Sequence, residues 1–254
     1  MSEIMQSRGF LKCPAFFEEM EHSDQSKGIP SPPHSKPPQG DLILLPDFDA
    51  ANSPVIHGGY EHLLDTRRSI RKYDESTPMK QEQLAFLLWS VGGIQAERGH
   101  GTFRPTPSGG ARHPFELYAA VQNVTGLKEG LYRYVPSEHI GEKKVGLEYI
   151  KPIADYEIQM KDAVAGQGWA TGASVMLFVS CVPYKAEWRY RGLAHRVLLI
   201  DLGHLGQNAM LSAAAMGLGS CCMAAYNQAK CDQVLGVDGV DEYTVYVISV
   251  GTLP

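Results

Sequence analysis

The chain has 254 residues, of which 44% are hydrophobic and 20% are charged, as in a globular protein with one large domain or two small ones. Acidic residues outnumber Lys and Arg by 28 to 23, so the net charge of −5 excludes a broad attraction to nucleic acid or to acidic membranes. No apolar run reaches the roughly 20 residues that span a bilayer, and residues 1–20 lack the apolar core of a signal peptide. We therefore expect a cytoplasmic protein.

Residues 28–40 (GIPSPPHSKPPQG) contain five prolines, which remove amide donors and exclude both a helix and a central strand. The stretch predicts an extended arm that lies along the body of the protein or along a partner subunit. The alternative is a ligand for an SH3-type domain. We expect residues 1–53 to form an N-terminal segment with this arm, and residues 54–254 to form the compact domain.

Three segments have the periodicity of helices. The first begins at His57, and the second, Gln81–Val91, is expected to stop at Gly92-Gly93 because glycine reaches left-handed geometry easily. The third, Ala194–Met216, is long and carries few charges. Its small residues would allow close helix approach, which suits a subunit interface.

Four runs have the character of strands. Two of them are rich in β-branched residues and nearly continuous in hydrophobicity, which favours a central place in a sheet. The central pair is Ser174–Val182 and Tyr243–Val250; the other two are Phe115–Val121 and Gly130–Val135.

A cationic cluster follows the first helix, at Arg67-Arg68-Ser69-Ile70-Arg71-Lys72. Guanidinium forks suit the oxygens of a phosphate, so the cluster is a candidate phosphate site. A solvated basic turn, paired with Asp65 or Asp74, accounts for the cluster equally well.

Two further segments could approach a ligand. In the loop 104–114 (RPTPSGGARHP), glycines would let backbone amides come close, although alone it is only a turn. Residues 221–226 (CCMAAY) follow Gly217 and Gly219, the glycine pair that ends the third helix. They could lie against a flat ring or simply form another buried strand. No Walker loop and no G-x-G-x-x-G occurs, so a pyridine nucleotide would bind only transiently.

Cysteines and histidines do not form a recognisable ligand set. The five cysteines lack paired C-x-x-C spacing, which argues for buried thiols and against a disulfide framework or a zinc site. Cys221 and Cys222 could be redox-active, but adjacent cysteines rarely form an unstrained bridge. No H-E-x-x-H pattern occurs, and no metal is predicted.

Taken together, three motifs resemble the nitroreductase superfamily of FMN enzymes, and more closely its SagB-type dehydrogenase branch, which includes azoline-oxidising partners of peptide cyclodehydratases. The motifs are RRSIRKYDE, PSGGARHPFELY and DLGHLGQNAMLSAAAMGLGSC, and the likeness covers roughly Pro54 to Gly251. The resemblance implies an α+β fold with a central mixed or antiparallel sheet flanked by helices, in an intertwined homodimer.

The resemblance also implies the cofactor contacts. The phosphate and polar edge of FMN would be bound by Arg67, Arg68, Ser69 and Arg71. The ring would be lined from the other subunit by Pro107, Ser108, Gly109 and Gly110. Backbone amides of Met223, Ala224 and Ala225 would lie beside N5 and O4 of the ring.

Two departures from the family pattern concern the site. Many members continue past the last strand and bring a basic residue to the phosphate, whereas this sequence stops at Pro254. Azoline-oxidising members carry a Lys-Tyr pair before the long helix, where this sequence has Arg189-Tyr190. Arginine stays protonated and is a poor base, and Tyr190 is either a proton donor in catalysis or an interface anchor beside Trp188.

The expected activity is transfer of hydride from NADH or NADPH through FMN to a small organic acceptor such as a quinone or nitroaromatic. The alternatives are oxidation of a thiazoline or oxazoline in a modified peptide, and a flavin-binding or flavin-cleaving protein without redox turnover.

Overall fold

The computed structural model describes residues 20–46, 59–98, 101–136 and 145–254. The predicted helices and strands are all present, and the structure adds further ones. The elements in chain order are β1 (Leu42–Leu44), α3 (Tyr60–Thr66), α4 (Gln81–Gly92), β2 (Ala96–Arg98), β3 (Gly101–Phe103), β4 (Phe115–Val121), β5 (Gly130–Val135), β6 (Gly146–Lys151), α5 (Tyr156–Ala163), β7 (Val175–Cys181), α6 (Tyr184–Tyr190), α7 (Ala194–Ala215), β8 (Leu218–Met223), α8 (Gln228–Leu235) and β9 (Tyr243–Thr252). The predicted helix start at His57 and the domain boundary at residue 54 lie outside the described residues.

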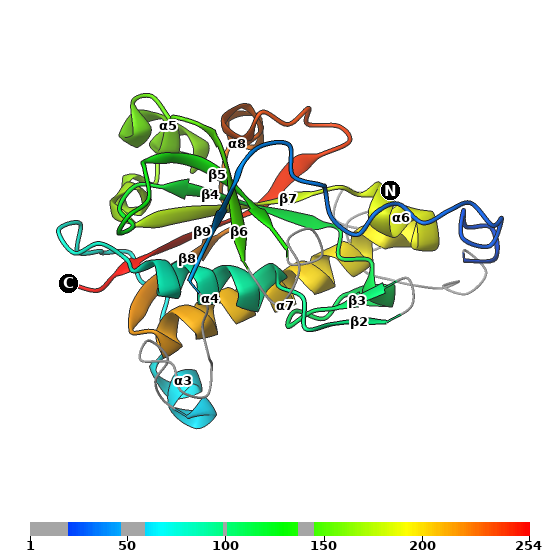
Figure 1. The fold of residues 1–254 in the computed structure, drawn as a ribbon, viewed down its shortest axis with the longest axis horizontal. Helices are drawn as coiled ribbons and strands as arrows, with labels where there is room; N and C mark the ends of the chain where they lie inside the picture. The colour runs from blue at the N-terminus through cyan, green and yellow to red at the C-terminus, as the bar shows by residue number, and fades with distance from the viewer. Residues whose placement is uncertain (1–19, 47–58, 99–100, 137–144) are drawn as a thin grey trace, which may run out of the picture.

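Seven strands form one sheet in the order β1-β6-β5-β4-β7-β9-β8 (Figure 1), and each neighbouring pair is antiparallel. The predicted α+β fold is confirmed, with an antiparallel sheet. β7 and β9 lie inside the sheet, as their continuous hydrophobicity predicts. β1, which belongs to the predicted N-terminal segment, pairs with β6 at one edge.

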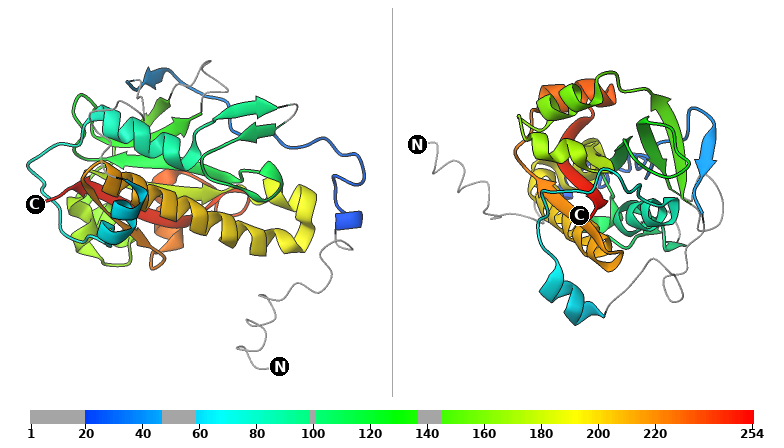
Figure 2. Two further views of the ribbon diagram at one scale, coloured as in Figure 1. Left: turned by 90° about the horizontal axis from the view of Figure 1, so that it is seen from below. Right: turned by 90° about the vertical axis from the view of Figure 1, so that its left-hand side faces the viewer.

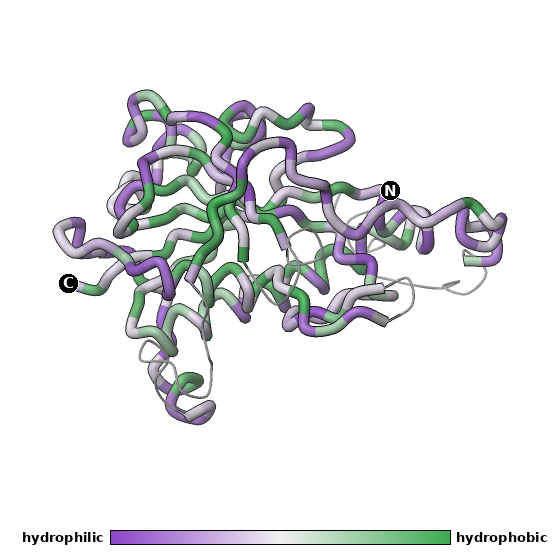
Figure 3. Tube along the Cα trace, viewed as in Figure 1, coloured by the Kyte–Doolittle hydropathy of each residue, from purple (hydrophilic) through white to green (hydrophobic). Residues whose placement is uncertain are grey.

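Helices cover both faces of the sheet. α4 and α7 pack on one face, where Leu88 and Leu205 meet alternate side chains of β4 such as Ala119. α5 and α8 pack on the other face against Tyr118 and Ala120. Figures 1 and 2 show these two layers on opposite sides of the strands. Because both faces are buried, the middle strands are hydrophobic along most of their length (Figure 3).

Helix α4 ends at Gly92, as predicted, but for another reason. Gly93 has φ −67°, so the left-handed geometry expected at this stop is not used. A Cβ at Gly93 would lie 2.3 Å from Cδ1 of Trp89. Glycine is needed here because the chain turns back closely over the last turn of its own helix.

The proline-rich arm lies along the body of its own chain, in agreement with the prediction. Side chains of the body donate to its backbone carbonyls, and proline does not hinder such contacts because it keeps its carbonyl. The donor and acceptor pairs are Trp188 Nε1 and the Ile29 oxygen (2.8 Å), Lys185 Nζ and the His34 oxygen (3.1 Å), and Arg133 Nη2 and the Pro37 oxygen (2.9 Å).

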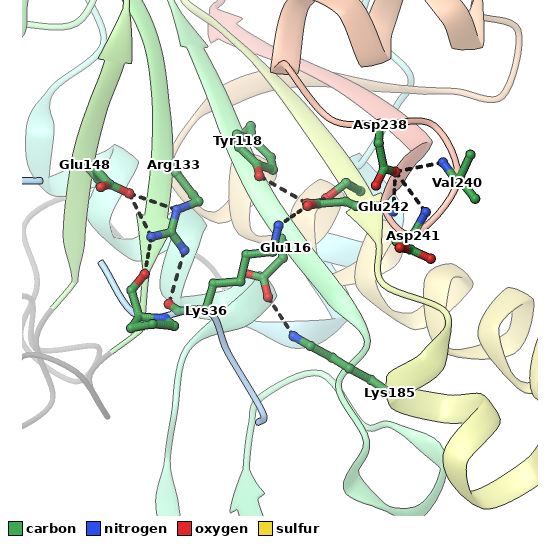
Figure 4. Close-up of polar contacts among 12 residues, drawn as sticks. Lys36, Glu116, Tyr118, Arg133, Glu148, Lys185, Asp238, Val240, Asp241 and Glu242 are labelled. Atoms are coloured by element: carbon green, nitrogen blue, oxygen red, sulfur yellow. Dashed lines mark hydrogen bonds and ion pairs between the residues drawn. The ribbon is translucent and has the colours of Figure 1, made fainter. Parts of the chain in front are cut away.

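Buried ion pairs stand behind the arm (Figure 4). Arg133 contacts Glu148 at 2.7 Å, and Lys185 contacts Glu116 at 2.6 Å, with all four side chains at most 5% exposed. Both cations therefore bind a carboxylate of the sheet and a carbonyl of the arm at once. The arm thus lies on the ends of β4, β5 and β6 through groups that are already fixed in place.

Candidate active site

The backbone of the predicted phosphate segment is fixed along the edge of the sheet. Ser69 forms a parallel bridge with Ser220, and the amide of Ile70 donates to the Ser220 oxygen at 2.9 Å. The amide of Asp74 donates to the Thr252 oxygen at 2.9 Å. A Cβ at Gly219 would lie 2.7 Å from Cγ2 of Ile70, so this close approach needs the glycine that precedes Ser220.

The arginine side chains of this segment have no carboxylate partner. Arg68 Nη1 donates to the Asp65 carbonyl at 2.7 Å, and the Arg71 guanidinium lies 5.6 Å from the ring centre of Trp169. None of the ion pairs among the described residues involves Arg67, Arg68 or Arg71. The carboxylate of Asp74 instead accepts from Ser76, and these hydrogen bonds lower its pKa to about 2. The ion pairs to Asp65 or Asp74 that the alternative of a basic turn expected are therefore not formed among the described residues.

The same segment lies beside the thiols of β8. Burial raises the pKa of Cys221, although Arg71 and Ser69 act against it, and burial raises the pKa of Cys222 to about 11. Both cysteines are free, and the raised pKa values disfavour the thiolate form, which argues against a nucleophilic role. The strand that was the alternative for this stretch is present as β8, which ends at Met223; Ala224 and Ala225 follow it and are exposed.

The glycine loop is organised by one buried carboxylate. Asp201 of α7 accepts from the Ser108 hydroxyl at 2.7 Å and from the Gly109 amide at 3.0 Å. The Ser108 oxygen in turn accepts from the His113 amide at 3.0 Å. Burial raises the pKa of Asp201, while the bonds from Ser108 and Gly109 oppose that change. Because both functions of the Ser108 hydroxyl are used within the chain, the side chain positions the loop.

Close packing leaves no room for side chains at Gly109 and Gly110. A Cβ at Gly109 would lie 2.4 Å from Cγ1 of Val197, and one at Gly110 would lie 2.6 Å from the Tyr190 hydroxyl. Gly110 also has φ +59°, which favours glycine. The loop therefore offers a ligand its backbone and little else.

Arg189 and Tyr190 both lie against this loop. Tyr190 is buried, and the Arg189 guanidinium lies 5.5 Å from the centre of its ring. The Tyr190 hydroxyl meets the loop at Gly110, which is compatible both with proton donation to a ligand and with a packing role. Sequence reasoning had placed the pair before the long helix but could not show this contact.

The predicted site residues fall into two groups. Ser69 bridges to Ser220 of β8, and Arg67 and Arg71 lie within electrostatic reach of the β8 thiols. The loop around Gly109 instead packs against Val197 and Asp201 in the first half of α7. Figures 1 and 2 show α3, which leads into the arginines, and the β2–β3 hairpin near the loop toward opposite ends of α7. One chain does not bring the two groups together. A site that uses both therefore needs a second subunit.

Asp201 is the residue that sequence reasoning missed. It is the sole acidic residue of α7, and it is buried in a helix whose neighbouring positions face the core. A single carboxylate within an apolar stripe is a usable signal, because buried charges are almost always paired or hydrogen-bonded.

The residues present fit an FMN molecule. Three guanidinium groups that have no counter-ion in the described part of the chain, next to Ser69, would provide donors for a phosphate dianion. The loop carries no side chain at Gly109 and Gly110, so its backbone amides would be the groups available to a flat ring. Among the described residues no cluster of three His, Cys, Asp or Glu side chains could hold a metal ion, and no helix is long and apolar enough to cross a membrane.

Comparison with known proteins agrees with this geometry. The model of the nitroreductase family matches residues 64–252. The chain is 30% identical over 211 residues to the "Putative nitroreductase MJ1384" of Methanocaldococcus jannaschii. The alignment covers 82% of this chain and 95% of that protein. It is 27% identical over 142 residues to the microcin B17-processing protein McbC of Escherichia coli. That alignment covers 53% of this chain and 49% of McbC.

A solved structure of a nitroreductase from Ralstonia eutropha superposes with a TM-score of 0.64 at 22% identity, covering 89% of this chain and 99% of the other. At this identity the likeness shows the fold alone. Together with the family match over residues 64–252 and the relative that aligns along nearly its whole length, it leads to one conclusion. The chain belongs to the nitroreductase family.

Proposed function

We propose that the protein is a cytoplasmic, homodimeric FMN-dependent oxidoreductase that passes hydride between NADH or NADPH and a small organic acceptor. When bound, FMN would supply hydride acceptance and donation at its N5 atom. The observation that carries the proposal is the set of three arginines beside β8 that lack carboxylate partners, in a chain that belongs to the nitroreductase family.

The chain's own groups would bind and orient the cofactor. Arg67, Arg68 and Arg71, with the hydroxyl of Ser69, would donate to the phosphate. The backbone at the end of β8, from Met223 through Ala224 and Ala225, would lie along the polar edge of the ring. Ala224 and Ala225 are exposed, so their amides are accessible in the single chain.

The second wall would come from the partner subunit. Pro107, Ser108, Gly109 and Gly110 would line the ring from the other chain, because in one chain they lie far along α7 from the arginines. α7 also exposes Leu199 and Ile200, at 56% and 49%, which is the kind of apolar surface that a dimer interface buries.

Nicotinamide donor and acceptor would use the ring face in turn. The sequence has no dinucleotide-binding glycine motif, which supports brief occupancy by NADH or NADPH. Tyr190, whose hydroxyl lies close to Gly110, would give a proton to the reduced acceptor.

Anaerobic mixing of the purified yellow protein with NADPH or NADH tests the proposal. We expect the visible flavin absorbance to bleach with at least one donor and to return when nitrofurazone is added. A chain that binds flavin but bleaches with neither donor would be a carrier without redox turnover. Loss of the flavin itself upon reduction in air would instead indicate a flavin-cleaving enzyme.

Dehydrogenation of an azoline in a modified peptide is the second candidate. It is favoured by the similarity to McbC, whereas Arg189, which stands where azoline-oxidising members carry Lys, argues against it. It would require a precursor peptide and a cyclodehydratase as partners. Turnover of a thiazoline-containing peptide, without NADPH-dependent reduction of nitrofurazone, would establish this function in place of the first.

A further inference from the structure

A cavity of about 620 Å3 lies between the proline-rich arm and the body, within the range of about 300 to 1,000 Å3 that is usual for ligand sites. Its lining combines the arm with the body next to the glycine loop. The lining residues are Gln25, Ser31, Pro32, Pro33, His34, Arg112 and Trp188.

Arg112 is a buried cation in this lining that has only neutral partners. Its Nε donates to the Lys185 carbonyl at 2.9 Å, and its Nη2 donates to the Ser31 hydroxyl at 2.5 Å. The guanidinium lies 4.6 Å from the ring centre of Trp188. A guanidinium has five N–H donors, so these two bonds leave donors available for a further acceptor.

Arg189 adds a second guanidinium, which is only half-buried but also has a neutral hydrogen-bond partner. Its Nη1 donates to Oε1 of Gln25 at 2.7 Å, and its Nε is buried without a hydrogen-bond partner. No ion pair among the described residues involves Arg112 or Arg189. Burial lowers the pKa of Arg112, and the nearby charge of Arg189 lowers it further.

Carboxylates of the neighbouring elements are already engaged elsewhere. Glu116 pairs with Lys185 at 2.6 Å, Glu187 pairs with His195 at 3.0 Å, and Asp24 pairs with Lys27 at 3.4 Å. A buried charge without a counter-ion is costly, and the cost disappears when an anion binds. Such a concentration of positive charge stands out in a chain whose net charge is −5.

We propose that this cavity is an anion-binding site in which Arg112, with Arg189 behind Gln25, binds the phosphate or carboxylate group of a ligand. Arg112 can offer two parallel N–H groups, the geometry that suits both anions. The Gln25 amide nitrogen would complete the donor set, while the Ser31 hydroxyl, which donates to the Pro32 carbonyl at 3.0 Å, holds Arg112 in place. The N-terminal segment thereby acquires a role, because Gln25 and, within the arm, Ser31 form one wall of the site.

The position of the site indicates what the anion belongs to. Arg189 and Tyr190 are adjacent in sequence, and both contact Gly110 of the predicted flavin loop. An anion held here would therefore be part of an extended substrate whose reactive end reaches the ring. This assignment to a substrate rests on the proposed function, whereas the anion site itself does not.

Thermal unfolding of the full-length protein, saturated with FMN, tests the site with inorganic phosphate as the probe. We expect the Tm to rise with phosphate and to saturate, and to stay lower in potassium chloride of equal ionic strength. Equal Tm values in the two salts would overturn the proposal.

A Gln25→Glu variant locates the effect without removing a buried arginine. The new carboxylate would take the place of an oxygen that already lies 2.7 Å from Arg189 Nη1. We expect a higher Tm without phosphate and at least a tenfold weaker response to phosphate. The control is Gln233→Glu, which adds the same charge on the exposed side of α8 and should keep the wild-type response. A wild-type response in Gln25→Glu would contradict the proposal.

Two further comparisons separate this site from the cofactor site and identify the ligand. An Arg67→Ala variant, altered at the predicted FMN phosphate site, should keep the phosphate response, so failure of the proposed function leaves this test intact.

Steady-state kinetics of the active enzyme identify the ligand that carries the anion. If the KM is lower for 4-nitrobenzoate than for nitrobenzene, and Gln25→Glu abolishes this difference, the anion belongs to the acceptor. A KM lower for NADPH than for NADH, abolished in the same way, assigns it to the donor. Absence of both differences would overturn the substrate assignment.

Discussion

The two halves of the candidate site are built differently. The glycine loop has its side chains engaged within the chain, with Ser108 bonded to Asp201 and Gly110 packed against Tyr190. The arginine segment has only its backbone fixed, along β8 and β9, and its guanidinium groups lack carboxylate partners. One half is thus a rigid surface, and the other is a set of unengaged charges.

This difference predicts how substitutions divide between stability and binding. Changes in the loop should destabilise the fold, because packed and hydrogen-bonded groups are lost. Changes in the arginine segment should weaken cofactor binding and leave the fold nearly unaffected, because exposed side chains contribute little to stability. The following experiments examine that division, beginning with the largest expected change in the free energy of unfolding.

Gly110→Ala should have the largest effect, lowering the free energy of unfolding by about 2 to 5 kcal/mol. An L-residue in left-handed geometry costs roughly 1 to 2 kcal/mol, and overpacking costs roughly 1 to 3 kcal/mol more. The new Cβ would lie 2.6 Å from the hydroxyl of the buried Tyr190. Urea unfolding measures the change. Gly192→Ala is the control, because no atom lies within 4 Å of the Cβ added there; equal stabilities of the two variants would contradict this reasoning.

Acid should destabilise the loop through His113. Burial lowers the pKa of His113 to about 3 from 6.5, so the unfolded chain binds the proton more tightly than the folded protein. The contribution of His113 to the free energy of unfolding is therefore fully present above pH 6.5. It is lost as the pH falls from 6.5 toward 3, by up to about 1.4 kcal/mol per pH unit. Urea unfolding at pH 7, 5.5 and 4 should show a slope that His113→Gln flattens. The exposed His62, changed to Gln, should leave the slope in place, and an unchanged slope in His113→Gln would refute the assignment.

Asp201→Ala should lower the free energy of unfolding by about 1.5 to 3 kcal/mol, the usual value of hydrogen bonds to a charged group. It leaves the Ser108 hydroxyl and the Gly109 amide without their acceptor. Asp201→Asn keeps one acceptor oxygen and should lose less. Urea midpoints of the two variants, compared with wild type, give the answer; an alanine variant as stable as the asparagine variant would remove Asp201 from its organising role.

Arg67→Ala and Arg71→Ala should change the stability of the apoprotein by less than about 0.5 kcal/mol. Each removes a contact to phosphate worth about 1.5 to 3 kcal/mol, so both variants should be purified without colour. Absorbance spectra and urea unfolding of the flavin-free forms measure the two effects. Lys72→Ala, a charge change in the same segment outside the predicted contacts, should stay yellow. Full retention of FMN in both arginine variants would refute the phosphate assignment.

Sequence periodicity was sufficient for the elements that are buried on both faces. β7 and β9 are apolar runs because each of their faces meets a helix, whereas α7 shows a stripe because one of its sides faces the core and the other exposes residues such as Leu199 and Ile200. β8 was harder, because its sequence LGSCCM has low strand propensity and is held by pairing to β9. β6 was hidden by the buried Glu148, whose partner Arg133 is distant in sequence.

The candidate site was predictable only where a local motif exists. The arginines and the glycines could be named from their order and spacing. The lack of carboxylate partners for the arginines, and the bonds of Asp201 to the loop, depend on distances between elements far apart in the chain. Arg112 illustrates the limit, since in sequence it is one more cation after a glycine pair, and only the fold buries it beneath Ser31.

The arm is recognised mainly through carbonyl oxygens, as the bonds from Trp188, Lys185 and Arg133 show. Every amino acid has a backbone carbonyl, so most side chains between Ile29 and Pro37 can be exchanged without altering the path of the arm. Related proteins could therefore carry different side chains over the cavity while the backbone of the arm keeps the same path.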